Sequence, residues 1–359
     1  MPEYMTNWDK TKKRFEAFWQ GEIVDRCMIS VFAPKKSAPP PRPYPTTKEG
    51  QLAHWYDGET VLKMYLEGFE HTYFGGDAMP SIFVNTGAAG HAGFFKGSSF
   101  DLTSNTVWFE PFIHDIEKDK LVFDPDSYLY KTTIALAKYL VAECKGRYFV
   151  SMPDTTGDLD ALAHMRSSEN LLVDMVENKS WVKDSMATIA QVWTQYTTQM
   201  HDIIYENNHG GSSVSWLSTW GPGRHGQLQS DISVMISADT FGEYVMPEMG
   251  YQCDWFDIPL YHFDGVEQIR HLDHLLSLEK LRAIQWTSVA GQPSLLEYLP
   301  VLKRIQEAGK SLILNAIDGH TIDVLMENLS SKGLYLLLHA KSEDEARDIV
   351  KKVEKLTRE

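Results

Sequence analysis

Short apolar runs recur along the chain, and each is bounded by glycine, proline or aspartate. Eight of them have the length and the β-branched or aromatic content of strands. They span residues 28–33, 81–87, 147–152, 212–218, 257–263, 282–287, 311–316 and 333–338. Their apolarity is continuous rather than alternating, which is typical of parallel strands covered on both faces. The pattern therefore predicts eight buried parallel strands.

Segments with the 3.6-residue period of amphipathic helices follow these strands, one after each. They span residues 59–73, 128–144, 180–206, 240–253, 266–278, 294–308, 320–330 and 342–357. The last begins at Ser342 with Glu345 three residues later, an S-x-x-E capping box that gives the helix a physical start. Eightfold alternation of strand and helix predicts an α/β protein, a single (β/α)8 TIM barrel over residues 1–359.

Two regions depart from this alternation. Residues 34–45 (PKKSAPPPRPYP) are rich in proline, which lacks an amide donor and cannot continue a helix or an inner strand. We expect an extended loop over the barrel mouth there, with an SH3-type ligand as the alternative. Residues 88–127 have no clear period, and we interpret them as a long loop insertion near the site.

Composition and charge exclude several kinds of partner. The net charge of −15 opposes binding to a phosphate backbone, so no nucleic-acid partner is expected. The three cysteines, Cys27, Cys144 and Cys253, form no C-x-x-C pair, which indicates a reducing compartment and no cysteine zinc site. The amino terminus lacks an apolar leader, and no stretch approaches the roughly 18 apolar residues of a membrane span. We expect a cytoplasmic protein with no membrane partner.

Polar and aromatic residues stand at the carboxyl ends of the predicted strands, where the active sites of α/β barrels lie. The candidates for substrate binding are Asn85, Trp216, Trp220, Asp231, Gln285, Trp286 and Asn315. The three tryptophans could line a planar or cationic ligand, or they could fill the core. For Asp231 the alternative is an amino-terminal helix cap.

The sharpest local pattern is YHFDG at residues 261–265, because period two places His262 and Asp264 on the same side of the strand end. This pair could ligate a metal such as zinc, act as a base with its orienting partner, or hydrogen-bond only within the turn. His339, at the end of the last strand, is the third candidate metal ligand. Asp154 is a further candidate catalytic group, for proton transfer.

Two longer stretches carry a family resemblance. Residues 14–26 contain R-x-x-A-x-x-x-G-x-x-x-D-R, and residues 230–265 end in His262-x-Asp264-Gly. Together they resemble the uroporphyrinogen decarboxylase superfamily, which includes corrinoid and cobalamin-linked methyltransferases. The resemblance covers essentially the whole chain. It implies a barrel with a deep cleft at the strand ends, a cytoplasmic location and a homodimer.

The branches of that superfamily imply different chemistry. In the zinc-dependent methyltransferases, H-x-C and a later cysteine hold the metal, whereas this chain has Asp264 at the first cysteine position. The resemblance implies methyl transfer from a small methylated substrate, with a corrinoid protein or cobalamin as partner. One alternative is a decarboxylase or lyase acting on a small carboxylic acid, in which His262, Asp264 and Asp154 transfer protons and Asp77 matches that branch's aspartate. The other is a ligand-binding barrel without catalysis.

Overall fold

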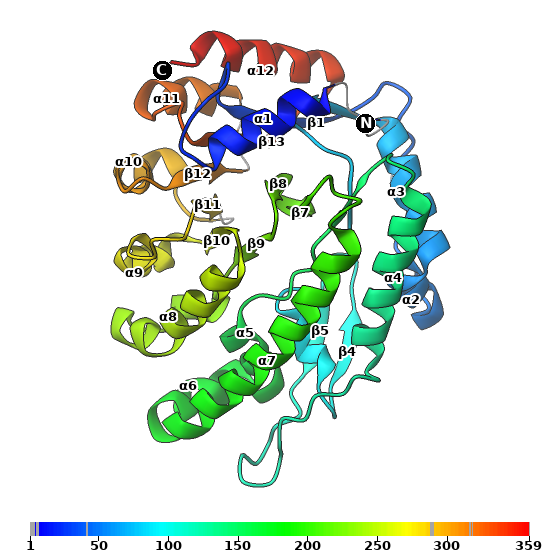
Figure 1. The fold of residues 1–359 in the computed structure, drawn as a ribbon, viewed down its shortest axis with the longest axis vertical. Coiled ribbons are helices and arrows are strands. Elements are labelled where there is room, and N and C mark those ends of the chain that lie inside the picture. The colour runs from blue at the N-terminus through cyan, green and yellow to red at the C-terminus, as the bar shows by residue number, and fades with distance from the viewer. Residues whose placement is uncertain are drawn as a thin grey trace.

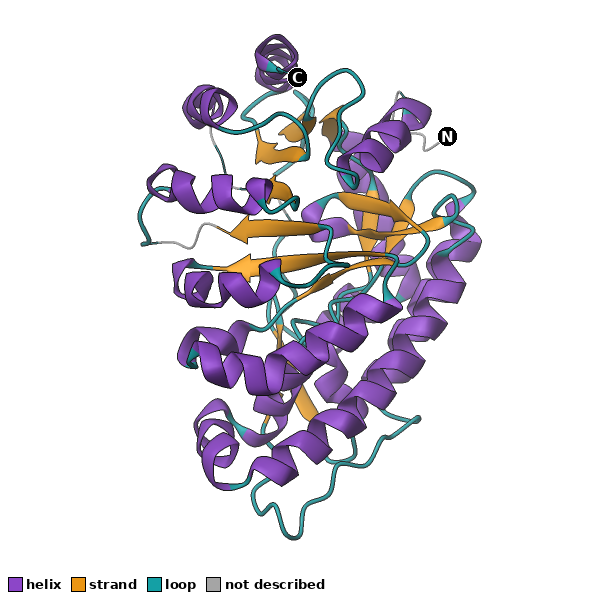
Figure 2. Cartoon of the chain, turned by 60° about the vertical axis from the view of Figure 1, so that its left-hand side comes forward, coloured by secondary structure: helices purple, strands orange, loops and turns teal. Residues whose placement is uncertain are grey.

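Helices lie outside the strands in the computed structural model, which describes residues 4, 7–40, 42–287, 291–315, 317 and 319–358 (Figures 1 and 2). Twelve α-helices are present in these residues. They are α1 (Trp8–Phe18), α2 (Lys48–Tyr56), α3 (Gly58–His71), α4 (Tyr128–Cys144), α5 (Asp158–Arg166), α6 (Ser168–Glu177), α7 (Lys179–Ile204), α8 (Ala238–Trp255), α9 (Leu272–Leu276), α10 (Leu299–Glu307), α11 (Gly319–Asn328) and α12 (Glu343–Leu356). None of these helices combines the length and the apolarity that a membrane crossing requires.

The central sheet has seven strands in the order β2-β1-β13-β12-β11-β10-β9. Its members are β1 (Met28–Pro34), β2 (Thr72–Gly76), β9 (His225–Leu228), β10 (Ile258–Asp264), β11 (Ala283–Thr287), β12 (Ser311–Leu314) and β13 (Leu334–His339). All neighbours in it are parallel except β2, which runs antiparallel to β1. Three further pairs form separately: parallel β3 (Ser81–Phe83) with β6 (Phe149–Ser151), and antiparallel β4 (Ser99–Leu102) with β5 (Val107–Glu110) and β7 (Gly211–Val214) with β8 (Thr219–Pro222).

The predicted α/β class is confirmed, with a mostly parallel central sheet. A closed barrel is not confirmed, because the hydrogen-bonded ladder among the described strands ends at β2 and at β9. Residue 316, the predicted end of the seventh strand, lies outside the described residues. The capping box at the start of α12 is confirmed: the Glu345 amide donates to Ser342 Oγ at 3.2 Å, and the Lys341 amide donates to Glu345 Oε2 at 2.6 Å.

Two predicted elements have a different structure. Residues 212–218 were expected to form the parallel strand before β10. They contain most of β7 and the short helix η2 (Ser215–Leu217), and β7 pairs antiparallel with β8. The strand that pairs with β10 is β9, whose sequence HGQL has no apolar run and gives no strand signal. Residues 88–127 are not a structureless insertion either, since they contain the short helix η1 (Gly90–Phe94) and the β4–β5 hairpin.

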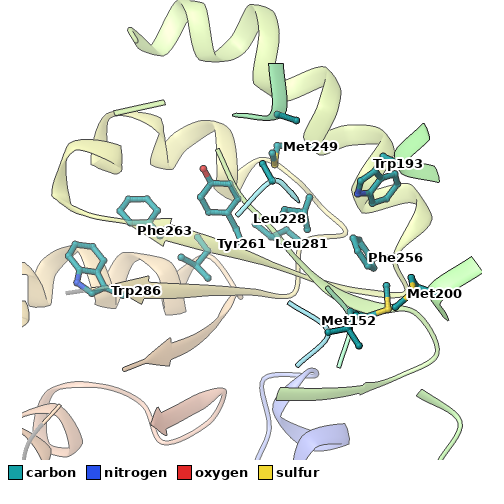
Figure 3. Packing of buried hydrophobic residues seen from close by; sticks show 14 of the residues in the cluster. Met152, Trp193, Met200, Leu228, Met249, Phe256, Tyr261, Phe263, Leu281 and Trp286 are labelled. Atoms are coloured by element: carbon teal, nitrogen blue, oxygen red, sulfur yellow. The ribbon is translucent and has the colours of Figure 1, made fainter. Parts of the chain in front are cut away.

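Side chains alternate between two faces of the parallel sheet, and the strand register fixes which residues share a face. Tyr261 and Phe263 of β10 lie opposite Ile284 and Trp286 of β11, and all four belong to the large core between sheet and helices. Figure 3 shows Tyr261, Phe263 and Trp286 on the same side of the two strands. We call this the helix-covered face of the sheet.

The opposite face, here called the inner face, carries His262, Gln285, Ile313, Tyr335 and Met28 in one row across five strands. Part of this row lies in a second, smaller core with aromatic residues of α1. That core includes Trp8, Phe15, Phe18, Trp19, Met28, Trp220, Ile313 and Tyr335. The amino-terminal helix therefore covers one end of the inner face and leaves the carboxyl ends of the strands to the site.

The charged residues of the opening motif form a buried ion-pair network at the amino end of β1. Arg14 binds both oxygens of Asp25, through Nε and Nη2, at 2.7 Å, and its Nη1 lies 2.9 Å from Asp77 Oδ1. Arg26 Nη1 lies 2.6 Å from the other oxygen of Asp77, which also accepts the amide of Ile29 at 3.2 Å. Asp77 is completely buried, so this network fixes α1 and the chain after β2 to the start of β1.

We predict that Asp77→Ala lowers the free energy of unfolding by about 3–5 kcal/mol, because it leaves two buried guanidinium groups short of a counter-charge. Urea denaturation followed by circular dichroism measures this. Asp101→Ala, which removes the exposed ion pair with Lys48, serves as the control and should cost less than about 1 kcal/mol. Equal losses in the two variants would contradict the prediction.

Candidate active site

A histidine and two aspartates meet at the carboxyl end of β10. His262 and Asp264 lie two residues apart on the inner face, and Asp231 reaches them from the start of the short helix η3 (Asp231–Met235). One potential ligand atom from each of the three residues lies within 4.8 Å of the others. We call this group the Asp231–His262–Asp264 triad. All three side chains are partly exposed, so a small molecule can reach them.

Gln285 of β11 fixes the orientation of the imidazole of His262. The register places the two residues opposite each other, and His262 Nδ1 lies 2.5 Å from Gln285 Oε1. The amide nitrogen of Gln285 donates to Thr287 Oγ1 at 2.8 Å, which leaves its oxygen as the acceptor. Nδ1 therefore carries the proton, and Nε2 keeps a lone pair for a metal or a proton. Trp216 packs edge-on against the ring, with centroids 4.9 Å apart.

Asp231 is held in place by a carboxylate that belongs to another helix. Both oxygens of Asp160, in α5, accept backbone amides at the start of η3: that of Asp231 at 2.8 Å and that of Ile232 at 2.8 Å. Glu248 of α8 in turn accepts the amides of Asp158 and Leu159 at the first turn of α5. The position of Asp231 thus depends on α5 and α8.

Burial changes the acidity of the carboxyl groups around the triad. Burial, together with the nearby charge of Asp231, raises the pKa of Asp154 to about 8. The hydrogen bond from Gln227 Nε2 to Asp154 Oδ1, at 3.1 Å, acts in the opposite direction. Burial also raises the pKa values of Asp160 and Asp231 above their ordinary range. Asp231 Oδ1 is buried and has no hydrogen-bond partner among the described residues. The site therefore holds at least one protonated carboxyl group at neutral pH.

The structure brings together six of the residues proposed from sequence. These are Asp154, Trp216, Asp231, His262, Asp264 and Gln285. Asn315 follows β12 on the inner face, with a buried Oδ1 that has no partner in the described part of the chain. Asn85 is partly buried after β3, and its Oδ1 accepts the amide of Gly87 at 2.9 Å. Among the described residues, no hydrogen bond joins either asparagine to the triad.

Three other candidates lie elsewhere. Trp286 follows the inward-facing Gln285 directly, so its side chain lies on the helix-covered face. There its ring stacks on that of Phe263, with the ring centroids 5.3 Å apart. Trp220 is completely buried in the core formed with α1, and its Nε1 donates to the carbonyl of Asn208. His339, predicted as the third metal ligand, is exposed and is not part of the triad. The third donor that the structure supplies is Asp231.

Sequence reasoning missed the residues that support the triad. Asp160 and Glu248 have partners 71 and 90 residues away, so no local spacing reveals their role. Gln227 lies in β9, which gave no strand signal. The one usable signal was the group of acidic residues at the start of α5, which reads as an ordinary helix amino terminus.

The triad fits a divalent metal ion by its donor types. One imidazole nitrogen and two carboxylate oxygens match a catalytic zinc site, which takes three protein ligands and keeps an open position. Tetrahedral zinc needs its ligands about 3.4 Å apart, so the side chains would close by roughly 1 Å. The three cysteines are free, buried and absent from the triad. These donors are harder than the thiolates of cysteine zinc sites, and they also suit manganese or iron.

Comparison with known proteins finds likeness in structure only. No protein-family model matches the chain, and no curated protein matches it. A solved methyltransferase from Methanosarcina mazei is similar to this chain with a TM-score of 0.58 and 11% sequence identity. The match covers 96% of this chain and 98% of that chain. At this identity the likeness shows a shared fold along nearly the whole length.

We predict that Gln285→Leu weakens zinc binding by about 10–100-fold, because the imidazole of His262 loses the acceptor that sets its tautomer. Isothermal titration with zinc measures the affinity, and nitrogen-15 NMR of the imidazole shows whether the proton leaves Nδ1. Gln20→Leu, an exposed glutamine at the end of α1, is the matched control and should change neither result. A tautomer unchanged in Gln285→Leu would refute the role given to this residue.

Proposed function

We propose that this protein is a methyl-transfer enzyme that acts on a small methylated substrate, with a corrinoid protein or cobalamin as its partner. The observation that carries the proposal is the Asp231–His262–Asp264 triad at the carboxyl end of β10, in a fold shared with a methyltransferase. The carboxyl ends of the strands are where parallel α/β folds build their active sites. The resemblance of residues 14–26 and 230–265 to the superfamily supports the same proposal.

The triad would hold the metal ion of this enzyme, with His262 binding through Nε2. A bound divalent ion supplies Lewis acidity toward the heteroatom that carries the methyl group. The residues of the chain position this chemistry. Gln285 orients the imidazole, Asp160 fixes the backbone of Asp231, and the edge of Trp216 shields one side of His262 from water.

Asp154 is the proposed proton donor. When the methyl group leaves, the heteroatom keeps the electron pair of the broken bond and needs a proton. Asp154 holds one at neutral pH, because burial raises its pKa to about 8. The charge of Asp231 contributes to this rise, which supports a role for Asp154 next to the triad. This match between proton affinity and working pH is what general acid catalysis requires.

Decarboxylation or lyase chemistry on a small carboxylic acid is the second candidate, and the raised pKa of Asp154 is the observation in its favour. The arginines near the amino terminus do not support it. Arg14 and Arg26 are paired with Asp25 and Asp77 at the amino end of β1, opposite the strand ends that carry the triad. Both guanidinium groups are therefore engaged in ion pairs at the end of the sheet away from the triad.

The proposed function includes a closed barrel, in which the strands form a ring around the inner face. Tyr335 on the inner face of β13 donates to the carbonyl of Ser218, between β7 and β8, at 2.7 Å. The Met152 amide, just after β6, donates to the carbonyl of Ser213 in β7 at 2.8 Å. These bonds support an enclosed inner face. The homodimer and the cytoplasmic location remain predictions from the resemblance and the composition.

We predict that the purified protein contains stoichiometric zinc or a similar divalent ion and transfers methyl groups from small methylated compounds to reduced cobalamin. His262→Ala should lower the rate at least about 100-fold, because it removes the only nitrogen ligand of the triad. Elemental analysis and the visible absorption of cobalamin measure the two results. His114→Ala, an exposed histidine on the loop after β5, is the matched control.

Absence of methyl exchange with cobalamin and with corrinoid proteins would count against the proposal. Release of carbon dioxide from small acids would favour the decarboxylase, and ligand binding without metal or turnover would favour a barrel that has no catalytic role.

We predict that the activity falls as the pH rises through about 8, because Asp154 then loses the proton it donates. Asp154→Asn should abolish this fall in activity at high pH and lower the rate about 100-fold or more.

The same residue makes the stability depend on pH. The folded-state pKa of Asp154 lies above the unfolded value of about 3.9, so the free energy of unfolding of the wild type falls between pH 4 and 8, by up to about 1.4 kcal/mol per pH unit. The variant should therefore gain stability relative to the wild type across that range. Asp184→Asn, exposed on α7, should alter neither curve.

A further inference from the structure

A large cavity lies at the carboxyl ends of β1 and β13, beside the proline-rich loop. Its volume is about 1280 Å³, large enough for a ligand of several rings. One side is formed by residues within 34–40 and 42–45, the other by α2 and α3, and the base by the ends of the two strands. We call it the proline groove. Lining residues that matter here are Phe32, Pro39, Pro43, Met64, His71 and His339.

The loop that forms one side of the groove is fixed to the helices opposite. Trp55 Nε1 of α2 donates to the hydroxyl of Tyr44 at 3.1 Å, and Gln51 Nε2 donates to the carbonyl of Pro45 at 3.3 Å. At the other end of the loop, the Lys35 amide donates to the carbonyl of His71 at 2.8 Å. Arg42 forms an ion pair with Glu67 of α3. The groove is therefore held open by contacts at both of its ends, and binding needs little reorganisation.

The apolar surfaces of the groove suit a flat ring. Proline rings line one side, and flat proline and aromatic surfaces pack well against each other, as in the recognition of proline-rich peptides by aromatic grooves. At the base, the rings of Phe32 and His339 lie 5.5 Å apart and are tilted by 31°. Met64 adds a flexible thioether, which makes favourable contacts with aromatic rings.

The polar groups of the groove favour a negative charge. Its single carboxylate, Glu67, is neutralised by Arg42. Lys63 also lines the groove, and it makes no ion pair within the described residues. His71 Nδ1 is buried and lacks a hydrogen-bond partner in the part of the chain that the structure describes. The groove thus presents one uncompensated cation and one unused imidazole nitrogen in a chain whose net charge is −15.

We propose that the proline groove is a binding site for an aromatic anion, a flat ring system bearing a carboxylate or a sulfonate. The ring packs between the prolines, Met64 and Phe32, and the anionic group pairs with Lys63. This inference goes beyond the proposed function and does not rest on it, because it concerns binding at residues that are not part of the triad.

Isothermal titration of the full-length protein with 2-naphthoate tests the proposal. The expected result is saturable 1:1 binding with a dissociation constant of roughly 0.1–1 mM. Its charge-reversed analogue, 2-naphthylmethylamine, should bind at least about tenfold more weakly. Met64→Asp, which places a second carboxylate in the groove, should weaken binding of 2-naphthoate at least about tenfold, and Lys63→Gln should weaken it about three- to tenfold.

Lys120→Gln is the matched control, because Lys120 is exposed on the loop after β5, remote in sequence from the groove, and makes no ion pair in the described structure. It should leave the affinity within about twofold. Circular dichroism confirms that each variant folds. Equal affinity for the two probes, unsaturable binding, or full affinity in Met64→Asp would each overturn the assignment. Because the readout is binding without metal or cobalamin, a failed methyl-transfer assay leaves this result unaffected.

Discussion

The alternation of side chains along a parallel ladder is the constraint on which the site depends. Once β10, β11, β12, β13 and β1 pair in the observed register, every second residue turns toward the helices and the others turn inward. The apolar residues of one set form the larger core, and α1 covers the amino end of the other set. His262 and Gln285 belong to the inner set and lie beyond that cover. A shift of one residue would bury both among the helices.

Asp231 is held by a series of hydrogen bonds, and the carboxyl groups around it lower the stability of the fold because they are buried. Glu248 holds the start of α5, Asp160 of α5 holds the backbone of Asp231, and this chain of contacts spans more than ninety residues of sequence. Buried carboxyl groups in such numbers oppose folding unless some keep their protons, which is what the raised pKa values of Asp154 and Asp160 indicate. The apolar packing elsewhere offsets this cost, as it does in most enzyme sites.

The sequence predicted those strands that carry a continuous run of apolar residues. The strands that became β1, β10, β11 and β13 were placed within two residues, since continuous apolar runs mark them. β9 was missed, because its sequence HGQL has no strand pattern of its own. It forms a strand through its pairing with β10. In the site, period two correctly placed His262 beside Asp264. The same rule separates Gln285 from Trp286, yet both were named as site residues. Asp160 could not be found, because its partner is fixed by tertiary packing alone.

The absence of sulfur from the triad affects its sensitivity to oxidation. Peroxide attacks thiolates and converts them to sulfenic and higher acids, which no longer bind metal. The triad contains no sulfur, and all three cysteines are buried, with burial raising the pKa of Cys253 to about 12 so that it stays a thiol. A metal ion held by one imidazole and two carboxylates would keep its donors under oxidants that destroy a thiolate site. Aerobic handling should leave its ligands chemically intact.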